Sequence, residues 1–354
     1  MMSGDNLTRR SLIALSSLAL AGCADGGSAY ESEDAAAPAE TPSRSARDTV
    51  YPYEFITTLG AFDELAASIS DTPGTVESLS YTCHAYAVEE ADGTDDVMVD
   101  KTLNVYLPSD YDPARRYDVL YLLHGTGGMQ DYWLGDGVSG TGDYHDDATR
   151  RLLDAMHDRG LFGDVIIVSP TYYSVPEGRI IDISFMGDDP YADLWPIHFW
   201  KELRNDIIPL VERAYPTYAA GDVDEKSLAA MRDHRGFAGL SRGSMTVINS
   251  GMMHCTDLFS YFGCFSGAWA DFDAFKEALE GEFAEYPVRF WYNGNGSKDF
   301  SLENHEQFVA QALEQMTDRF VDGENYAWVS FPGGEHAYNC WALDLYNCLL
   351  AFFN

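Results

Sequence analysis

The chain has 354 residues, of which 46% are hydrophobic and 14% aromatic, and it is therefore long enough to bury one large core. Its 57 Asp and Glu residues outnumber its 22 Lys and Arg residues, which gives a formal net charge of −35. A surface this acidic repels phosphate backbones, so the composition argues against a nucleic-acid partner. We interpret the acidity as favouring solubility in an external medium.

The N-terminus has the pattern of an export signal. Arg9 and Arg10 precede a short apolar run over residues 12–20, which ends in Leu20-Ala21-Gly22-Cys23. Paired arginines are typical of twin-arginine signals, and the apolar run is too short to span a bilayer. The last four residues resemble a bacterial lipobox, in which the cysteine is lipidated. We predict a signal peptide over residues 1–22, lipidation of Cys23 and display as a bacterial cell-surface lipoprotein that touches the membrane only through this anchor. A buried N-terminal helix is the alternative.

The next segment, residues 23–50, is rich in Ala, Ser, Glu, Asp and Pro and nearly lacks large apolar side chains. Such a composition cannot bury a core, which predicts a flexible acidic linker after the lipidated cysteine. We therefore expect the catalytic domain to occupy residues 51–354.

Five cysteines remain besides Cys23, and an odd number leaves at least one unpaired within the chain. Cys255 and Cys264 are close enough in sequence to pair, as are Cys340 and Cys348, but spacing leaves both pairings open. No pair of cysteines has the spacing of a zinc site, and no metal is expected.

From residue 81 onward, segments typical of strands and helices alternate. We expect strands at 81–88, 101–107, 118–123, 164–169, 235–238, 259–265, 288–292 and 326–331, with residues 89–96 forming a hairpin connection. We expect helices at 149–159, 198–215, 245–253 and 341–353. This alternation predicts an α/β fold with a mostly parallel central sheet and helices on both faces. Ligands bind such sheets at the carboxyl ends of the strands.

The pattern G-x-S-x-G occurs once, at Gly239-Leu240-Ser241-Arg242-Gly243. An expected strand precedes it and an expected helix follows it, which is the context of a nucleophile elbow in an α/β-hydrolase. The flanking glycines allow the chain to turn sharply enough to expose the hydroxyl. We interpret Ser241 as a nucleophile, with an ordinary glycine-rich turn as the alternative.

A serine hydroxyl needs a base, and the base needs an acid that holds its tautomer. His336 follows the expected strand at 326–331, so its loop opens at the same sheet edge as Ser241. The acid lies between serine and histidine in this fold, and Asp299 is the candidate that closely follows a strand. We predict a triad of Ser241, Asp299 and His336, with a solvated turn residue as the alternative for Asp299.

The developing oxyanion needs backbone donors. The loop His124-Gly125-Thr126-Gly127-Gly128 follows the expected strand at 118–123 and matches an H-G-x-G-G oxyanion motif of esterases. We assign the donors to the amides of Arg242 and Thr126, with Gly125 as the alternative to Thr126.

Taken together, these motifs resemble the feruloyl-esterase and esterase D-like family of α/β-hydrolases, of the carbohydrate esterase type. The resemblance covers about three quarters of the chain and is carried by residues 105–108, 117–128, 239–243, 262–267, 293–299 and 333–341, together with Trp133. It implies a Ser-Asp-His triad that uses no metal and no cofactor. One departure is Arg242-Gly243-Ser244, where relatives more often carry Met-Gly-Gly, and it places a charged side chain next to the nucleophile.

Trp133 and Trp341 flank the oxyanion loop and the catalytic histidine, which makes them candidates for substrate binding. Core packing is the alternative for both. Residues 170–198 are long enough to form part of the cleft wall or a lid.

We predict a serine carboxylic-ester hydrolase that works through an acyl-enzyme. The family resemblance implies feruloyl, acetyl or other acyl esters of plant carbohydrate as substrates. Two alternatives remain, an acyltransferase that passes the acyl group to a sugar hydroxyl and a non-catalytic surface binding protein.

Overall fold

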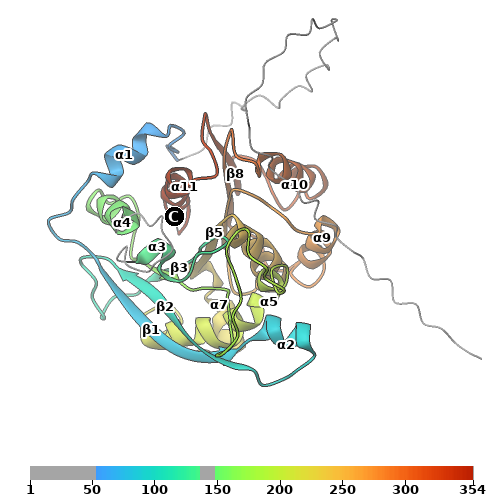
Figure 1. Ribbon diagram of the computed structural model, residues 1–354. Coiled ribbons are helices and arrows are strands. Elements are labelled where there is room, and N and C mark those ends of the chain that lie inside the picture. Colours follow the sequence, from blue (N-terminus) through green and yellow to red (C-terminus); the bar gives the residue numbers. More distant parts are fainter. Residues whose placement is uncertain (1–52, 136–147, 354) are drawn as a thin grey trace, which may run out of the picture. The chain divides into compact units, whose positions relative to one another are not determined.

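An eight-stranded sheet organises the described residues, 53–135 and 148–353, of the computed structural model (Figure 1). The predicted signal peptide, Cys23 and the linker lie outside the described residues. The strand order is β1-β2-β4-β3-β5-β6-β7-β8. The strands are β1 (Thr75–His84), β2 (Met98–Leu107), β3 (Asp118–Leu123), β4 (Val165–Ser169), β5 (Arg235–Leu240), β6 (Tyr261–Phe265), β7 (Phe290–Gly296) and β8 (Tyr326–Phe331).

Strands β3 to β8 run parallel, whereas β1 pairs antiparallel with β2 and β2 pairs antiparallel with β4. The predicted mostly parallel sheet is therefore confirmed. Strand β3 lies between β4 and β5, so the chain order reverses on either side of it. At such a switch point, loops leave two neighbouring strands in opposite directions and open a crevice at their carboxyl ends.

Helices cover both faces of the sheet, as predicted. One face packs against α1 (Gly60–Ala66), α3 (Asp131–Leu134), α4 (Ala148–Asp158) and α11 (Tyr338–Ala351). The other packs against α2 (Tyr86–Asp92), α5 (Trp195–Glu202), α6 (Ile208–Ala214), α7 (Glu225–Ala230), α9 (Phe272–Glu280) and α10 (Leu302–Gln315). Figure 1 shows α1, α4 and α11 together on one side of the strands.

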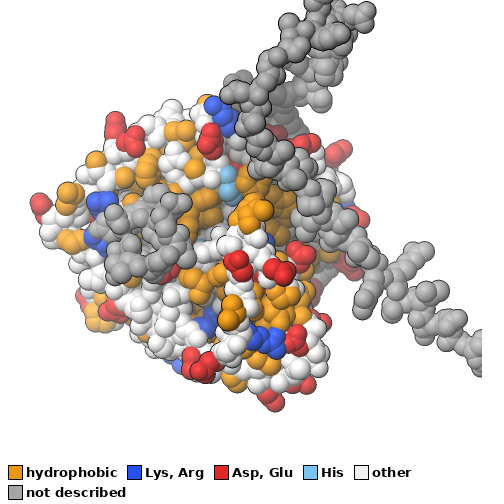
Figure 2. Space-filling model, in the orientation of Figure 1, with side chains coloured by type: hydrophobic (Ala, Val, Ile, Leu, Met, Phe, Trp, Pro, Cys, Tyr) orange, Lys and Arg blue, Asp and Glu red, His pale blue; other side chains and the backbone are white. Residues whose placement is uncertain are grey.

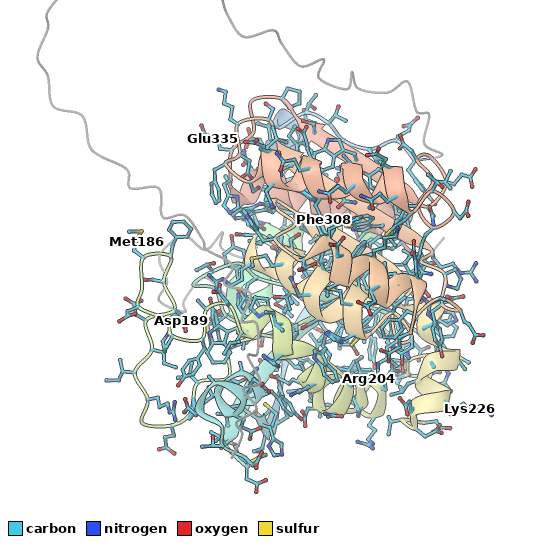
Figure 3. The ribbon with its side chains drawn as sticks, turned by 90° about the vertical axis from the view of Figure 1, so that its right-hand side faces the viewer. Met186, Asp189, Arg204, Lys226, Phe308 and Glu335 are labelled. Atoms are coloured by element: carbon cyan, nitrogen blue, oxygen red, sulfur yellow. The ribbon has the colours of Figure 1, made fainter. Side chains whose placement is uncertain are left out.

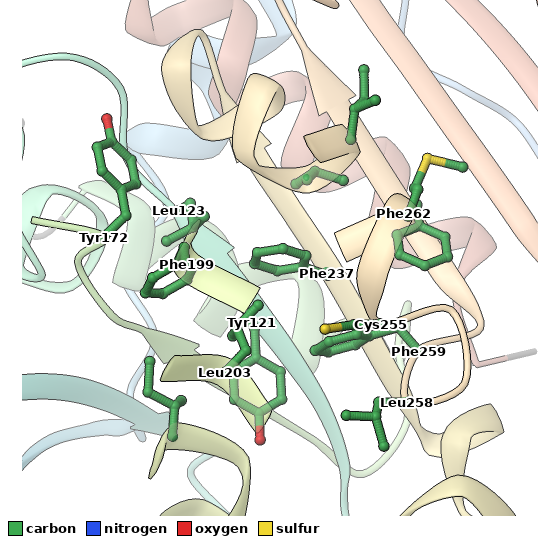
Figure 4. Close-up of a cluster of buried hydrophobic side chains, with 14 of the residues drawn as sticks. Tyr121, Leu123, Tyr172, Phe199, Leu203, Phe237, Cys255, Leu258, Phe259 and Phe262 are labelled. Atoms are coloured by element: carbon green, nitrogen blue, oxygen red, sulfur yellow. The ribbon is translucent and has the colours of Figure 1, made fainter. Parts of the chain in front are cut away.

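The alternation of side chains along β3 supplies both cores. Val119, Tyr121 and Leu123 belong to one buried cluster, and Leu120 and Leu122 belong to the other. Because both faces are covered, the whole run is apolar rather than alternating with polar residues. Figure 4 shows Tyr121 and Leu123 among the side chains of Phe199, Phe237 and Phe259, which come from α5, β5 and the turn before β6.

The expected strand at 81–88 and its hairpin connection are wrong in part. The strand ends at His84, and a helix, α2, occupies residues 86–92. Ala and Glu are good helix formers, and Ala87 and Val88 bury their side chains in the core cluster. Gly93, at φ 64°, ends the helix in the left-handed conformation.

The expected helices elsewhere begin or divide at other residues. The helix expected at 198–215 consists of α5, a π-helical turn at Leu203–Ile207 and α6. The helix expected at 245–253 begins earlier, as α8 (Arg242–Thr246), and continues as a π-helix at Val247–Met252. None of the described helices has the length and apolar character needed to cross a membrane.

Each of the five cysteines in the described residues is buried and has a free thiol. The two pairings that spacing left open are therefore not formed. Burial raises the pKa of Cys255, Cys264 and Cys340 to about 12, which keeps these thiols protonated and unreactive.

Candidate active site

Ser241 lies at the tight turn between β5 and α8. Its backbone has φ 53° and ψ −117°, a conformation that residues other than glycine rarely adopt. A Cβ atom at Gly239 would lie 2.7 Å from the carbonyl carbon of Gly243, and one at Gly243 would lie 2.4 Å from the carbonyl oxygen of His124. Both motif glycines are therefore required by close packing. The Ser241 amide donates a hydrogen bond of 2.7 Å to the Phe265 carbonyl, which holds the turn against β6.

The loops after β7 and β8 bring Asp299 and His336 to Ser241. The Nε2 atom of His336 lies 3.0 Å from the Oγ atom of Ser241, and its Nδ1 atom lies 2.9 Å and 3.0 Å from the two carboxylate oxygens of Asp299. With Nδ1–H donating to Asp299, Nε2 is free to accept the proton of the serine hydroxyl. The structure thus brings together the three residues predicted from the sequence.

The Asp299 side chain is fully buried beneath the imidazole. Burial alone raises the pKa of this carboxyl, but the hydrogen bond from His336, the charge of that histidine and the amide of Ser301 outweigh burial and leave the pKa lowered. The amide and hydroxyl of Ser301 donate to Oδ1 at 2.8 Å and 2.7 Å. Asp299 therefore stays ionised next to His336. Sequence reasoning missed Ser301, although its position two residues after the acid was a usable signal.

The oxyanion loop is held by a buried histidine at its start. The Nδ1 atom of His124 donates to the carbonyl oxygen of Gly125 at 2.7 Å, and its Nε2 atom accepts from the Thr171 hydroxyl at 2.8 Å. Burial lowers the pKa of His124 to about 3, so the ring is neutral and these two contacts require one tautomer. The carbonyl of Gly125 and the amide of Thr126 belong to one trans peptide, whose two ends point in opposite directions. His124 therefore aims the amide of Thr126.

Gly125 packs directly under the nucleophile. A Cβ atom at this position would lie 2.6 Å from Cδ1 of Leu240 and 3.2 Å from Cβ of Ser241. No larger residue fits between the loop and Ser241 without moving one of them.

The side chain of Arg242 connects three parts of the site. Its Nε atom donates to the hydroxyl of Thr126 at 3.0 Å, and its guanidinium also donates to the carbonyl of Ala192. Ala192 belongs to residues 174–194, which form no helix or strand and lead into α5, and which we call the crossing segment. The crossing segment also approaches the oxyanion loop, because a Cβ atom at Gly127 would lie 3.6 Å from Cα of Ser184. The sequence marked Arg242 as unusual but did not predict these partners.

The two tryptophans chosen for substrate binding are both buried. Trp133 is 2% exposed and donates its indole N–H to the carbonyl of Leu123 at 3.0 Å. Trp341 is 7% exposed, donates to the hydroxyl of Ser266 at 2.8 Å, and sets its ring edge-on to His336 at 4.9 Å between centroids. These contacts anchor the oxyanion strand and orient the imidazole, and substrate binding by either ring stays a prediction.

An open cavity of about 620 Å³ lies elsewhere, between the starts of the strands. Its lining includes Asp118, His234 and Arg289, which stand at or next to the first residues of β3, β5 and β7. Ser241, His336 and Asp299 follow the opposite, carboxyl ends of their strands, so this cavity is separate from the candidate active site. Among the residues with described positions, no group of three or more His, Cys, Asp or Glu side chains is arranged to hold a metal ion.

The comparisons with known proteins identify a family and a fold. The family model described as "Putative esterase" matches residues 97–352. Endo-1,4-beta-xylanase Y of Acetivibrio thermocellus is 28% identical over 266 residues, which make up 72% of this chain and 22% of that protein. The chain therefore spans about a fifth of the length of this curated relative.

Two solved structures share the fold. A serine-to-alanine mutant of a feruloyl esterase module from Clostridium thermocellum, complexed with sinapinate, matches with a TM-score of 0.62 and 24% identity, covering 82% of this chain and 92% of the module. A CE1 ferulic acid esterase from Anaeromyces mucronatus, in complex with ferulic acid, matches with a TM-score of 0.61 and 21% identity, covering 82% of this chain and 95% of that one. The family match over residues 97–352 and the shared fold lead to one conclusion: the chain belongs to the esterase family that this model describes and has the α/β-hydrolase fold.

Proposed function

We propose that Ser241, His336 and Asp299 form the catalytic triad and that the enzyme cleaves feruloyl or other acyl esters of plant carbohydrate. The observation that carries the triad is the pair of hydrogen bonds on one imidazole, at 3.0 Å to Ser241 and 2.9 Å to Asp299. This geometry gives the serine a base and gives the base an ionised partner.

The reaction proceeds in two halves. The Oγ atom of Ser241 attacks the ester carbonyl while Nε2 of His336 takes its proton, and the amides of Thr126 and Arg242 donate to the oxyanion that forms. His336 then gives the proton to the departing alcohol, which leaves an acyl-enzyme. Water attacks the acyl-enzyme with His336 again as the base, and the acid is released.

The substrate class rests on similarity. The feruloyl esterase module of known structure holds sinapinate and the ferulic acid esterase holds ferulic acid, both of which are hydroxycinnamic acids. The sequence relative bears the name of a xylanase, which acts on a plant polysaccharide. Together they favour an aromatic acid esterified to plant carbohydrate.

Hydrolysis of an ester panel by the purified protein tests this proposal. The panel holds p-nitrophenyl acetate, methyl ferulate, a chlorogenate-type ester and acetylated xylan, and Ser241→Ala is the matched variant. We expect methyl ferulate to be cleaved and the variant to lose at least 10⁴-fold of the activity, on the order seen when a triad serine is removed. An inert wild type, an equally active variant, or a product formed only with an added sugar acceptor would contradict the proposal, and the last result would indicate an acyltransferase.

We also propose that the protein is exported and anchored through Cys23, on the strength of the paired arginines and the Leu-Ala-Gly-Cys end of the apolar run. The wild type expressed in a bacterial host is expected in the detergent phase of a detergent–water partition and Cys23→Ala in the aqueous phase. Equal partitioning of the two proteins would contradict lipidation.

A further inference from the structure

Two exposed phenylalanine rings neighbour each other, and one of them lies against His336. Phe300 directly follows Asp299, is 62% exposed, and places its ring centroid 4.3 Å from that of His336. Phe185, on the crossing segment, is 75% exposed and lies 6.4 Å from Phe300 between centroids. Apolar side chains gain stability by leaving water, so two neighbouring rings that stay exposed at a catalytic group form a surface typical of a binding site.

The position of these rings relative to the reacting atoms identifies the half of the ester that they contact. His336 delivers its proton to the alcohol that leaves, so the alcohol must depart along the imidazole. Phe300 lies against that imidazole, and Phe185 continues the surface outward. The crossing segment also reaches the oxyanion loop, since a Cβ atom at Gly127 would lie 3.6 Å from Cα of Ser184, so Phe185 stands near the reacting atoms. The pair therefore borders the alcohol of the substrate.

The crossing segment is held by contacts that follow Phe185 in the sequence. Arg242 binds the carbonyl of Ala192, and Asp189 accepts a hydrogen bond of 2.8 Å from the indole of Trp195. Figure 3 shows Met186 and Asp189 on a loop that stands away from the helices, on the same side of the molecule as Glu335. Figure 2 shows hydrophobic side chains gathered in the middle of one face of the molecule, around an exposed part of a histidine.

The charge around the pair indicates what kind of alcohol fits. The crossing segment carries one arginine and five acids, which are Glu177, Asp182, Asp188, Asp189 and Asp193. Its arginine, Arg179, is already paired with Asp92 at 2.6 Å, and the exposed Glu335 stands next to His336. An anionic alcohol would be repelled here. The alcohol therefore has to pack against two aromatic rings and has to carry no negative charge. A neutral sugar ring does both, because its C–H face packs against the phenyl groups and its hydroxyls donate hydrogen bonds to the carboxylates.

We propose that Phe185 and Phe300 form an alcohol-side subsite that takes a neutral sugar ring. The inference rests on the proposed function, since it assumes that Ser241 is acylated by an ester whose alcohol passes His336. The sugar touches the pair only until it leaves, so the subsite accelerates formation of the acyl-enzyme and has no effect on its hydrolysis.

Two esters of the same acid, methyl ferulate and a feruloyl arabinoside, separate the alcohol from the acyl group. For the wild type, kcat/KM should favour the arabinoside, and this preference should fall about tenfold in Phe185→Ala, which corresponds to about 1.4 kcal/mol. Phe185 is the decisive position, because its ring contacts Phe300 and not His336. Phe300→Ala would also alter the surroundings of the imidazole. Met186→Ala, an 88% exposed neighbour on the same tip, is the matched control and should leave the preference unchanged.

Three outcomes overturn the subsite. These are an equal loss on both esters, no loss on either, or a loss in Met186→Ala as large as in Phe185→Ala. A feruloyl ester of a sugar acid that is cleaved as well as the neutral arabinoside at low salt would overturn the neutral-sugar assignment. If the wild type fails to cleave methyl ferulate in a Ser241-dependent way, the proposed function fails instead, so the two failures are distinguishable.

Discussion

The oxyanion loop and the crossing segment both border the candidate active site, but they are held in different ways. The loop is anchored by a buried ring, since His124 is fully enclosed and uses both nitrogens for hydrogen bonds. The crossing segment lacks regular structure and exposes Ile180, Phe185 and Met186 by 100%, 75% and 88%.

This difference follows from what each region has to do. Donors to an oxyanion stabilise the transition state only when they are already in place, so a loop that supplies them has to be rigid. A surface that binds the outer half of a substrate can remain exposed, because the substrate itself covers it. We call the triad and the oxyanion loop with its supports the inner side of the site. We therefore expect substitutions on the inner side to lower kcat for every ester and substitutions in the crossing segment to act on some esters only.

The largest effect expected beyond the nucleophile is that of Asp299→Asn. The amide keeps the shape of the side chain but can hold His336 in the wrong tautomer, which costs about 10⁴-fold in kcat in triads of this kind. Steady-state hydrolysis of methyl ferulate measures the loss. A variant that keeps more than a tenth of the wild-type kcat would mean that Asp299 is a structural partner only.

A smaller loss is expected from Thr171→Val, which removes the hydroxyl that fixes His124. Without this donor the imidazole can carry its proton on Nε2, and its bare Nδ1 then faces the Gly125 carbonyl and no longer aims the Thr126 amide. We expect kcat to fall on the order of 10-fold to 100-fold for all esters, less than the loss of a whole oxyanion donor.

The matched control is Thr171→Ser, which keeps the hydroxyl and should restore most of kcat. Binding of a boronic acid that mimics the tetrahedral intermediate should weaken in parallel with kcat, whereas binding of ferulate should stay the same. Parallel weakening of both ligands would indicate a general structural defect instead.

The stability of the protein should also respond to acid through His305, on α10. This buried ring contacts Asn293 at 3.0 Å through Nε2 and accepts from the Gly267 amide at 3.2 Å, and burial lowers its pKa to about 3. Below its ordinary pKa of about 6.5 the unfolded chain takes up a proton that the folded chain does not. Stability contributed by this group is therefore present above pH 6.5 and is lost as the pH falls toward 3.

His305→Gln removes this proton uptake and isolates its contribution. The stability difference between wild type and variant should shrink by on the order of 2 kcal/mol between roughly pH 6.5 and pH 4.5. Urea denaturation at several pH values measures both proteins under the same conditions. A difference that stays constant over this range would contradict a neutral buried His305.

The smallest effect is expected from Arg242→Met, which replaces the guanidinium by an uncharged side chain. Without the guanidinium, the hydroxyl of Thr126 and the carbonyl of Ala192 lose their hydrogen bonds to residue 242, but the backbone amide of this residue stays in place. We expect kcat/KM to fall about threefold for a feruloyl sugar ester and less for methyl ferulate, since the crossing segment then loosens. An equal fall for both esters would assign Arg242 to the inner side of the site.

The sequence by itself determined the features that depend on short stretches of chain. The strands β3, β4 and β8 follow from continuous apolar runs, and the turn at Ser241 follows from two glycines within five residues. The positions of Asp299 and His336 followed from one rule, that loops after parallel strands open at the same edge of the sheet. Local composition and strand polarity were therefore enough to predict the fold class and the three residues that meet.

Only the tertiary structure decided which side chains face one another across long separations. The hydrogen bond from Thr171 to His124, the attachment of Arg242 to Ala192 and the approach of Phe185 to Phe300 join residues between 47 and 115 positions apart. It also placed Trp133 in the core, where the carbonyl of Leu123 on β3 accepts a hydrogen bond from its indole N–H. Spacing along the chain carries no information about such contacts, since they depend on how the helices and the crossing segment pack onto the sheet.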